Sequence, residues 1–300
     1  MTKLFFLRGI FFELSGVDIR YEQLTGTCLT IMLIAALVCF VTGEITRNYS
    51  QVDKLWSFMP VVYSMIPLAA YPSPRILIMC FLVTIWGLRL TYNLYRKGGY
   101  NKIPWKGEED YRWKIMRRHP ALQGRIRFGL FNLIFISFYQ HLLIFLFSTP
   151  LFIAARYRNS SLTLTDMIAA SLMLLFIFTE TVADYQQFRF QTLKQQKHKS
   201  ENLYLVSLKK GFLSEGLWRF VRHPNYASEQ AIWISFYLFG AAASGKWINW
   251  TIIGSVLLIL LFLGSTKLTE LISGDKYPEY ARYIKDVPKF IPKVFSSNKK

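Results

Sequence analysis

Cysteine is scarce in this chain, and the few cysteines present build no recognisable site. Cys28, Cys39 and Cys80 lie in or next to apolar segments and include no C-x-x-C pair. This placement argues against a disulfide framework and against the usual zinc-binding motifs. The four histidines show no metal-ligand spacing either. We therefore expect the cysteines to be buried core residues and the protein to hold no metal.

The motifs of familiar soluble enzymes are also missing. The sequence has no G-x-G-x-x-G element, P-loop, H-E-x-x-H or G-x-S-x-G element, and the alternation typical of strands is weak throughout. The first residues form no convincing cleavable signal peptide, because Glu13 and Asp18 follow the short apolar run without a small-residue cleavage site. Any chemistry must therefore be built from helix ends and from the loops between helices.

Apolar residues, by contrast, are abundant and gathered into long blocks. Hydrophobic residues make up 52% of the 300 positions and aromatic residues 17%. A helix crosses the bilayer core with about 20 apolar residues. The blocks predict an all-α, polytopic membrane protein with about seven transmembrane helices, at residues 24–43, 55–71, 76–95, 128–154, 164–183, 227–245 and 247–266. We expect one membrane domain at 24–293, preceded by an interfacial segment at 1–23 and followed by a tail at 294–300.

The net charge of +18 is distributed unevenly along the chain. Ten Lys and Arg side chains lie in 96–127, eight in 184–226 and eight from Lys267 onward. With seven spans these segments fall on one side of the membrane, and the positive-inside rule makes that side cytosolic. A nucleic-acid partner would also explain a basic chain, but it would not predict this alternation, so none is expected. The host membrane, endoplasmic reticulum or bacterial inner membrane, stays open.

The richest polar stretch is 216–229, which reads Gly-Leu-Trp-Arg-Phe-Val-Arg-His-Pro-Asn-Tyr-Ala-Ser-Glu and precedes an apolar block. Pro224 suits the first turn of a helix, where its missing N–H has no intrahelical partner. Free N–H groups and the positive end of the helix dipole would then face any anion held by the nearby arginines. The stretch indicates a site for a phosphorylated or carboxylated cofactor beside the membrane. A basic cluster that only contacts lipid headgroups is the alternative.

Polar side chains also recur at helical spacing where the block 164–183 ends. Glu180, Asp184 and Gln187 lie on one face of the helix that leaves this block. Ionisable side chains at the edge of a membrane span are costly and need a reason. These could hold ribose or amide groups of a cofactor. A salt bridge between Asp184 and a basic loop is the alternative.

A second pair at helical spacing, Arg89 and Asn93, closes the block 76–95. Arginine binds phosphate well because its planar guanidinium donates two parallel hydrogen bonds. The same arginine could instead extend to the membrane surface as an anchor. Asp53, at the start of the block 55–71, could be an ordinary N-cap.

Six landmarks occur in order between residues 50 and 293. They are Val-Asp-Lys-Leu-Trp-Ser (52–57), Thr-Ile-Trp-Gly-Leu-Arg-Leu (84–90), Gly-Glu-Glu-Asp-Tyr-Arg-Trp (107–113), Glu-Thr-Val-Ala-Asp-Tyr-Gln-Gln-Phe (180–188), the stretch 216–229, and Lys-Tyr-Pro-Glu-Tyr-Ala-Arg-Tyr (276–283) followed by Phe-Ile-Pro (290–292). Together they resemble the membrane proteins grouped with the steroid 5-alpha-reductase C-terminal domain, in particular an uncharacterised branch of that group. One landmark would be weak, whereas six in order are specific.

The resemblance implies a seven-helix membrane reductase that binds NADPH from the cytosolic side. Hydride would pass to an electron-poor carbon of a lipid-like alkene, so the bilayer and a hydrophobic sterol, isoprenoid or acyl substrate are the expected partners. The residues expected to bind the cofactor are Arg89, Asn93, Glu180, Asp184, Arg189, Arg222, His223, Asn225, Tyr226, Tyr277 and Tyr280. The candidate catalytic residues are Asp53, Tyr92 and Glu229.

Within that set the resemblance assigns parts of the cofactor. Asn225 and Glu229 would contact the nicotinamide carboxamide or groups near it. Asp184 and Arg189 would contact the adenosine half or a phosphate. Ser228 departs slightly from the family, which usually has glycine there.

The substrate side departs further. The Gln-Glu pair with which steroid reductases hold the steroid ketone is not recognisable, and Asp53 and Lys54 occupy roughly that region. A steroid substrate is therefore unsupported.

Two other functions remain open. Isoprenylcysteine carboxyl and phospholipid methyltransferases resemble the same C-terminal region but bind S-adenosylmethionine. They usually place an apolar residue where Asn225 stands, lack Glu229, and carry a Glu-Glu pair where this chain has Thr269 and Glu270. A non-catalytic lipid-binding membrane protein is the third alternative, although burying so many polar groups without a ligand would be costly.

Overall fold

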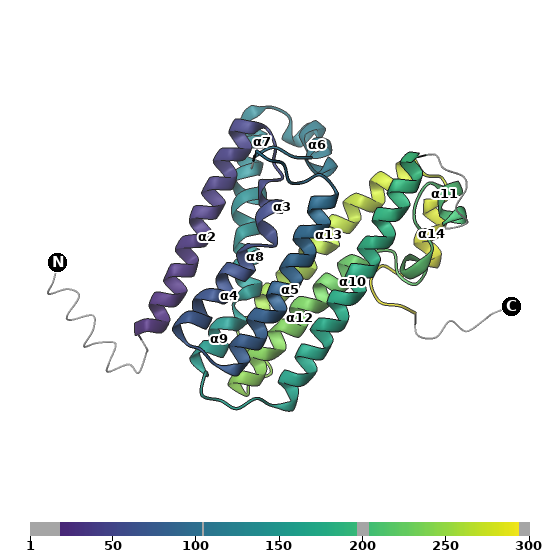
Figure 1. Ribbon diagram of the computed structural model, residues 1–300. Coiled ribbons are helices and arrows are strands. Elements are labelled where there is room, and N and C mark those ends of the chain that lie inside the picture. The colour runs from purple at the N-terminus through teal and green to yellow at the C-terminus, as the bar shows by residue number, and fades with distance from the viewer. Residues whose placement is uncertain (1–18, 104, 197–203, 294–300) are drawn as a thin grey trace. The chain divides into compact units, whose positions relative to one another are not determined.

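The computed structural model describes residues 19–103, 105–196 and 204–293. The tail expected at 294–300 and nearly all of the interfacial segment expected at 1–23 lie outside these ranges. All regular structure in the described ranges is helical, which confirms the all-α prediction (Figure 1).

The chain divides into two compact units. The first comprises residues 1–170 and 236–254, and the second comprises residues 171–235 and 255–300. Three long helices contribute residues to both units: α10 (Leu164–Gln196), α12 (Pro224–Ser244) and α13 (Ile252–Lys276).

The first unit begins with helices that local signals delimit well. Its elements are α2 (Ile19–Thr46), α3 (Gln51–Trp56), α4 (Met59–Ala70), α5 (Pro74–Arg96), α6 (Tyr111–Arg118), the 3-10 turn η1 (Pro120–Leu122), α7 (Arg125–Phe131), the π-helix η2 (Asn132–Tyr139), α8 (Gln140–Ser148) and α9 (Pro150–Arg156). At the start of α5 the Ser73 hydroxyl accepts a hydrogen bond from the Ile76 N–H at 3.3 Å. At the start of α6 the Asp110 carboxylate accepts one from the Arg112 N–H at 2.9 Å. Both are N-caps, which satisfy N–H groups that have no intrahelical partner.

The second unit combines parts of the long helices with short elements. These are α11 (Leu205–Lys210), the 3-10 turn η3 (Gly216–Arg219) and α14 (Tyr280–Asp286). Phe190, Leu193, Tyr204 and Leu213 form one apolar cluster. Phe212, Tyr280 and Tyr283 form another. The two clusters hold the short elements against α10 and against each other.

Five helices in the described ranges are long and apolar enough to cross a membrane: Tyr21–Thr46, Pro74–Arg96, Arg125–Arg156, Leu164–Gln195 and Ile252–Lys276. Their outer faces suit lipid. On α2, for example, Cys28, Met32 and Cys39 are buried, whereas Ile34 and Leu37 are more than half exposed. Apolar faces of this size are stable in a bilayer but not in water. The chain is a multi-pass membrane protein.

Two of the seven expected spans are not among these five helices. The block 55–71 is divided between α3 and α4, and α4 has only 12 residues. The block 227–245 is helical within α12, but α12 is not among these five helices. The membrane sides assigned from seven spans therefore stay a prediction.

The cysteine prediction is confirmed. Cys28, Cys39 and Cys80 are free thiols and all three are buried. In the described ranges no three His, Cys, Asp or Glu side chains are grouped so that they could hold a metal ion.

Candidate functional site

A hydrogen bond joins α10 to the start of α12 within the second unit. Asn225 Nδ2 donates to Asp184 Oδ1 at 3.2 Å. Because an ionised carboxylate only accepts, the amide nitrogen must face Asp184 and the amide oxygen must face elsewhere. That oxygen, Asn225 Oδ1, is buried, as is Gln187 Oε1, and neither accepts a hydrogen bond within the described ranges. The site thus presents two buried acceptor atoms.

Three carboxylates are buried on the same two helices. Glu180, Asp184 and Glu229 are each about 5% exposed or less. Glu180 lies one turn before Asp184, and Glu229 lies one turn after Asn225. The Trp233 indole N–H donates to Glu229 Oε1 at 3.0 Å and fixes that side chain. The region is therefore rich in hydrogen-bond acceptors and in negative charge.

Arg222 and His223 converge on Glu270 of α13. Arg222 Nε lies 2.8 Å, and His223 Nε2 2.9 Å, from the same Glu270 oxygen. Burial lowers the pKa of His223, and the nearby Glu270 carboxylate does not fully offset this effect. His223 is therefore neutral at pH 7 and donates its Nε2–H to the carboxylate.

The guanidinium of Arg222 is also occupied on its other edge. Its Nη1 donates to the carbonyl of Ile284 at 2.9 Å and to the carbonyl of Val287. The backbone N–H of Arg222 donates to the Pro288 carbonyl at 2.9 Å. Arg222 thus anchors the segment after α14 through Nε and Nη1, and its expected role in cofactor binding stays a prediction.

Tyr226 and Tyr280 occupy aromatic surroundings. The ring of Tyr226 stacks on His223 at 5.6 Å between centroids and meets Phe262 at 4.7 Å. Tyr280 is buried and meets Phe212 edge to face at 4.9 Å. These contacts position the segments around Glu270.

Tyr277 lies next to a cation. Lys194 Nζ donates to the Tyr277 hydroxyl at 2.7 Å and to the Gly211 carbonyl at 2.5 Å. Burial acts to raise the pKa of Tyr277, but Lys194 and Lys276 together lower it below its ordinary value. The phenol is therefore a better proton donor than a free tyrosine.

In the first unit, Asp53 is the third residue of α3 and is not its N-cap, which is Ser50. The Trp113 indole N–H donates to Asp53 Oδ2 at 3.3 Å. Burial raises the pKa of Asp53, and the neighbouring Asp110 adds to the shift. Asp53 therefore keeps its proton to a higher pH than an ordinary aspartic acid does.

The other first-unit candidates lie on α5. Asn93 is buried and accepts hydrogen bonds from Arg96 Nε at 3.0 Å and from Arg96 Nη2 at 2.7 Å. Tyr92 is 63% exposed. Arg89 lies one turn before Asn93 and is partly buried. Their expected roles in cofactor binding and catalysis stay predictions.

Each unit thus gathers its own part of the predicted site. The second unit brings together Asp184 with Asn225, and Arg222 with His223. The sequence interpretation missed Glu270 as a partner of the last two. Its signal was present, because a carboxylate one turn past the end of the block 247–266 requires a cation or a functional role.

Comparison with known proteins identifies a family without an assigned activity. A family model described as "Protein of unknown function (DUF1295)" matches residues 39–287, so the chain belongs to this family. The chain is 38% identical over 285 residues to the uncharacterized protein C594.04c of Schizosaccharomyces pombe, covering 89% of this chain and 81% of that protein. No solved structure matches. The resemblance to steroid 5-alpha-reductase therefore stays a prediction.

Proposed function

We propose that this DUF1295 protein is a membrane reductase that binds NADPH between α10 and the start of α12 and reduces a carbon–carbon double bond of a lipid-like substrate. The supporting observation is the pair of buried acceptors, Asn225 Oδ1 and Gln187 Oε1. A buried polar atom that lacks its hydrogen bond costs about 1–3 kcal/mol. A ligand that donates hydrogen bonds at this point would remove that cost.

The donor groups of NADPH fit such a site. Its nicotinamide carboxamide carries an N–H₂ group and its riboses carry hydroxyls, all of which can donate to amide and carboxylate oxygens. Asn225 would accept from the carboxamide, and Glu180 and Asp184 would accept from hydroxyls. When bound, the dihydronicotinamide supplies a hydride. The fixed Glu229 carboxylate would help to orient the group beside it.

The phosphate end needs cations that are not already committed. Arg222 is held by Glu270 and two carbonyls. Arg219 is exposed at the end of η3 and stacks over the Phe220 ring at 4.5 Å. Arg219 would therefore be better placed than Arg222 to meet a phosphate, and Arg222 would shape the site.

One observation favours S-adenosylmethionine as a second candidate. The three buried carboxylates of the region would attract a ligand that carries positive charge, and the sulfonium and ammonium groups of this cofactor do. The polar Asn225 and its free oxygen favour NADPH, because a carboxamide can satisfy that oxygen.

The deciding experiment measures thermal unfolding of the full-length chain in detergent with NADPH, NADH or S-adenosylmethionine. A ligand at a hundred times its dissociation constant adds about 2.7 kcal/mol of stability. We expect NADPH to raise the unfolding midpoint, and Asn225→Ala and Gln187→Leu to weaken its binding. Gln191→Leu, at an exposed position one turn further along α10, is the matched control. Stabilisation by S-adenosylmethionine alone would replace the proposal with a methyltransferase, and no response to any ligand would refute both.

A further inference from the structure

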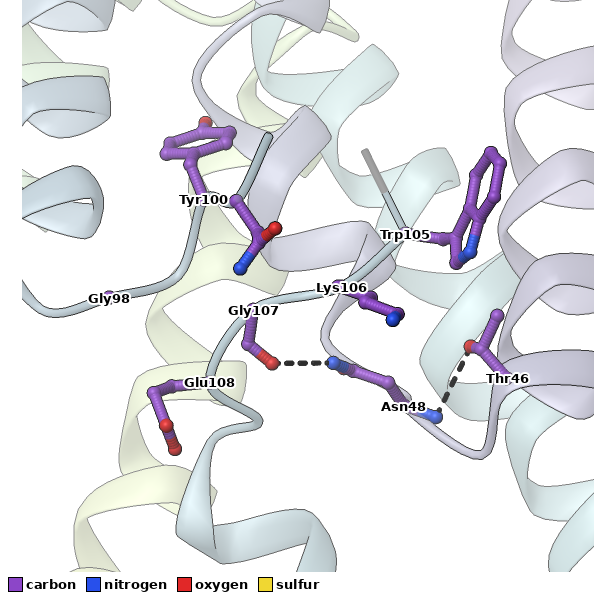
Figure 2. A pocket seen from close by; sticks show the side chains of 9 residues that line it. Thr46, Asn48, Gly98, Tyr100, Trp105, Lys106, Gly107 and Glu108 are labelled. Atoms are coloured by element: carbon purple, nitrogen blue, oxygen red, sulfur yellow. Dashed lines mark hydrogen bonds between the residues drawn. The ribbon is translucent and has the colours of Figure 1, made fainter. Parts of the chain in front are cut away.

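The first unit contains a pocket that the proposed reductase site does not use. It has a volume of about 720 Å³. Its lining residues are Thr46, Asn48, Gly98, Tyr100, Asn101, Trp105, Lys106, Gly107 and Glu108 (Figure 2). Two candidate membrane spans, Tyr21–Thr46 and Pro74–Arg96, end at this pocket. It therefore lies where lipid headgroups meet the ends of membrane helices.

One wall of the pocket is held by one side chain of the connection between α2 and α3 and by two side chains of α3. Three successive carbonyls of the loop, those of residues 105, 106 and 107, each accept one hydrogen bond. Asn48 Nδ2 donates to the Gly107 carbonyl at 2.9 Å, as Figure 2 shows. Gln51 Nε2 donates to the Trp105 carbonyl at 3.1 Å. Lys54 Nζ donates to the Lys106 carbonyl at 2.8 Å.

The opposite wall is fixed by backbone contacts. The Glu108 N–H donates to the Gly98 carbonyl at 2.8 Å. A Cβ atom at Gly107 would lie 2.2 Å from the Gly99 carbonyl oxygen, so the two loop segments touch there. The pocket therefore has a defined shape even though it lies in loops.

Groups of both charges line the pocket. Within the described ranges, neither the Lys106 ammonium nor the Glu108 carboxylate takes part in an ion pair or a side-chain hydrogen bond, and both side chains are exposed. The rings of Tyr100 and Trp105 complete the lining. A cation is attracted to the face of an aromatic ring and to a carboxylate, whereas a phosphate is attracted to an ammonium group.

From this combination we propose that the pocket binds the zwitterionic headgroup of a phospholipid, with the phosphate at Lys106 and the ammonium group at Glu108. An anionic headgroup would be repelled by Glu108 and would leave that carboxylate without a cationic partner. The site does not depend on the reductase proposal, because its residues belong to the first unit and need no cofactor.

The test uses the full-length chain in detergent micelles that contain phosphatidylcholine, phosphatidylethanolamine or phosphatidylglycerol at equal mole fraction. Native mass spectrometry counts the retained lipids, and a titration gives the affinity. We expect a zwitterionic lipid to be retained in preference to phosphatidylglycerol. Lys106→Gln and Glu108→Gln should each weaken retention about tenfold, because each removes one charge-assisted contact. Lys102→Gln, an exposed lysine of the same loop outside the pocket, should bind as wild type.

Three results would overturn the assignment. Equal retention of phosphatidylglycerol would show that charge selection is absent. Wild-type affinity in both pocket variants would place the lipid elsewhere. If soluble phosphocholine bound as tightly as the lipid, the ligand of the pocket would be a water-soluble molecule and not a phospholipid. Unchanged unfolding midpoints of the variants without lipid would show that loss of binding is not loss of folding.

Discussion

Arg75 and Asp166 form a buried ion pair in which Arg75 Nε lies 2.7 Å from Asp166 Oδ1 and Arg75 Nη2 lies 2.9 Å from Asp166 Oδ2. Each side chain is only 2% exposed. The guanidinium also donates to the carbonyls of Ser160 and Ser161. The pair therefore ties the start of α5 to the start of α10 within the first unit.

We predict that Arg75→Ala destabilises the protein by about 3–5 kcal/mol, because Asp166 would remain as a buried carboxylate without its cation. The measurement is the shift in the unfolding transition in detergent. Arg282→Ala is the control, since Arg282 and Asp286 are 88% and 63% exposed and such surface pairs contribute little. An equal shift in both variants would contradict the argument.

His223 gives a prediction about pH. Burial lowers its pKa in the folded protein, so the unfolded chain binds a proton more readily. Its contribution to stability is therefore fully present above the ordinary histidine pKa of about 6.5 and is lost as the pH falls towards the folded value. The groups around the ring are Glu270, Arg222 and Lys289.

We accordingly expect the stability advantage of wild type over His223→Gln to be largest at neutral pH and to shrink below about pH 6.5. Unfolding curves for both proteins between pH 5 and 8 check this. Taking the difference between the two proteins removes the titration of other groups. An advantage that grows as the pH falls would mean that His223 is charged in the folded state.

Helical periodicity in the sequence predicts part of this structure well. The block 164–183 begins where α10 begins, and Pro224 is the first residue of α12, as expected. The shared face of Glu180, Asp184 and Gln187 also follows from spacing alone. These features are local, so the sequence carries them directly.

Two other features were not expected from the sequence. The block 55–71 was expected to be one span, but α3 ends at Trp56 and α4 starts at Met59. The next residue is Pro60, whose backbone nitrogen carries no hydrogen and cannot donate a hydrogen bond to the preceding turn. Arg222 was expected to bind a cofactor, which stays a prediction, and the structure shows that it also binds carbonyls after α14. Periodicity cannot show that contact, because it depends on how residues 284–287 fold back.

Asp53 gives a prediction that separates stability from catalysis. Burial and Asp110 raise the pKa of Asp53, so ionising this carboxyl group costs more free energy in the folded protein than in the unfolded chain. Asp53→Asn should therefore keep or raise the unfolding midpoint at pH 7, because the amide oxygen can still accept from Trp113. Asp53→Ala should lower it, because it leaves the indole N–H without this acceptor.

If Asp53 is a proton donor, Asp53→Asn should also abolish turnover in a reductase assay while cofactor binding persists. Calorimetry and the activity assay on the same preparations test both statements. A fully active Asp53→Asn protein would remove Asp53 from the catalytic candidates, and a large loss of stability would contradict the burial argument.

Gly107 and Gly124 give the last prediction, because they share an unusual backbone but differ in their surroundings. Both have positive φ angles, 132° and 99°. A Cβ at Gly107 would meet the Gly99 carbonyl oxygen at 2.2 Å, whereas one at Gly124 would meet nothing within 4 Å. Alanine at either position incurs backbone strain of about 1–3 kcal/mol, but only Gly107→Ala must also push two loop segments apart.

We expect Gly107→Ala to lower the unfolding midpoint more than Gly124→Ala and to speed tryptic cleavage at Lys102 and Lys106. Equal effects of the two substitutions would show that the loop relaxes freely, and the pocket would then lack the rigid wall that headgroup binding requires.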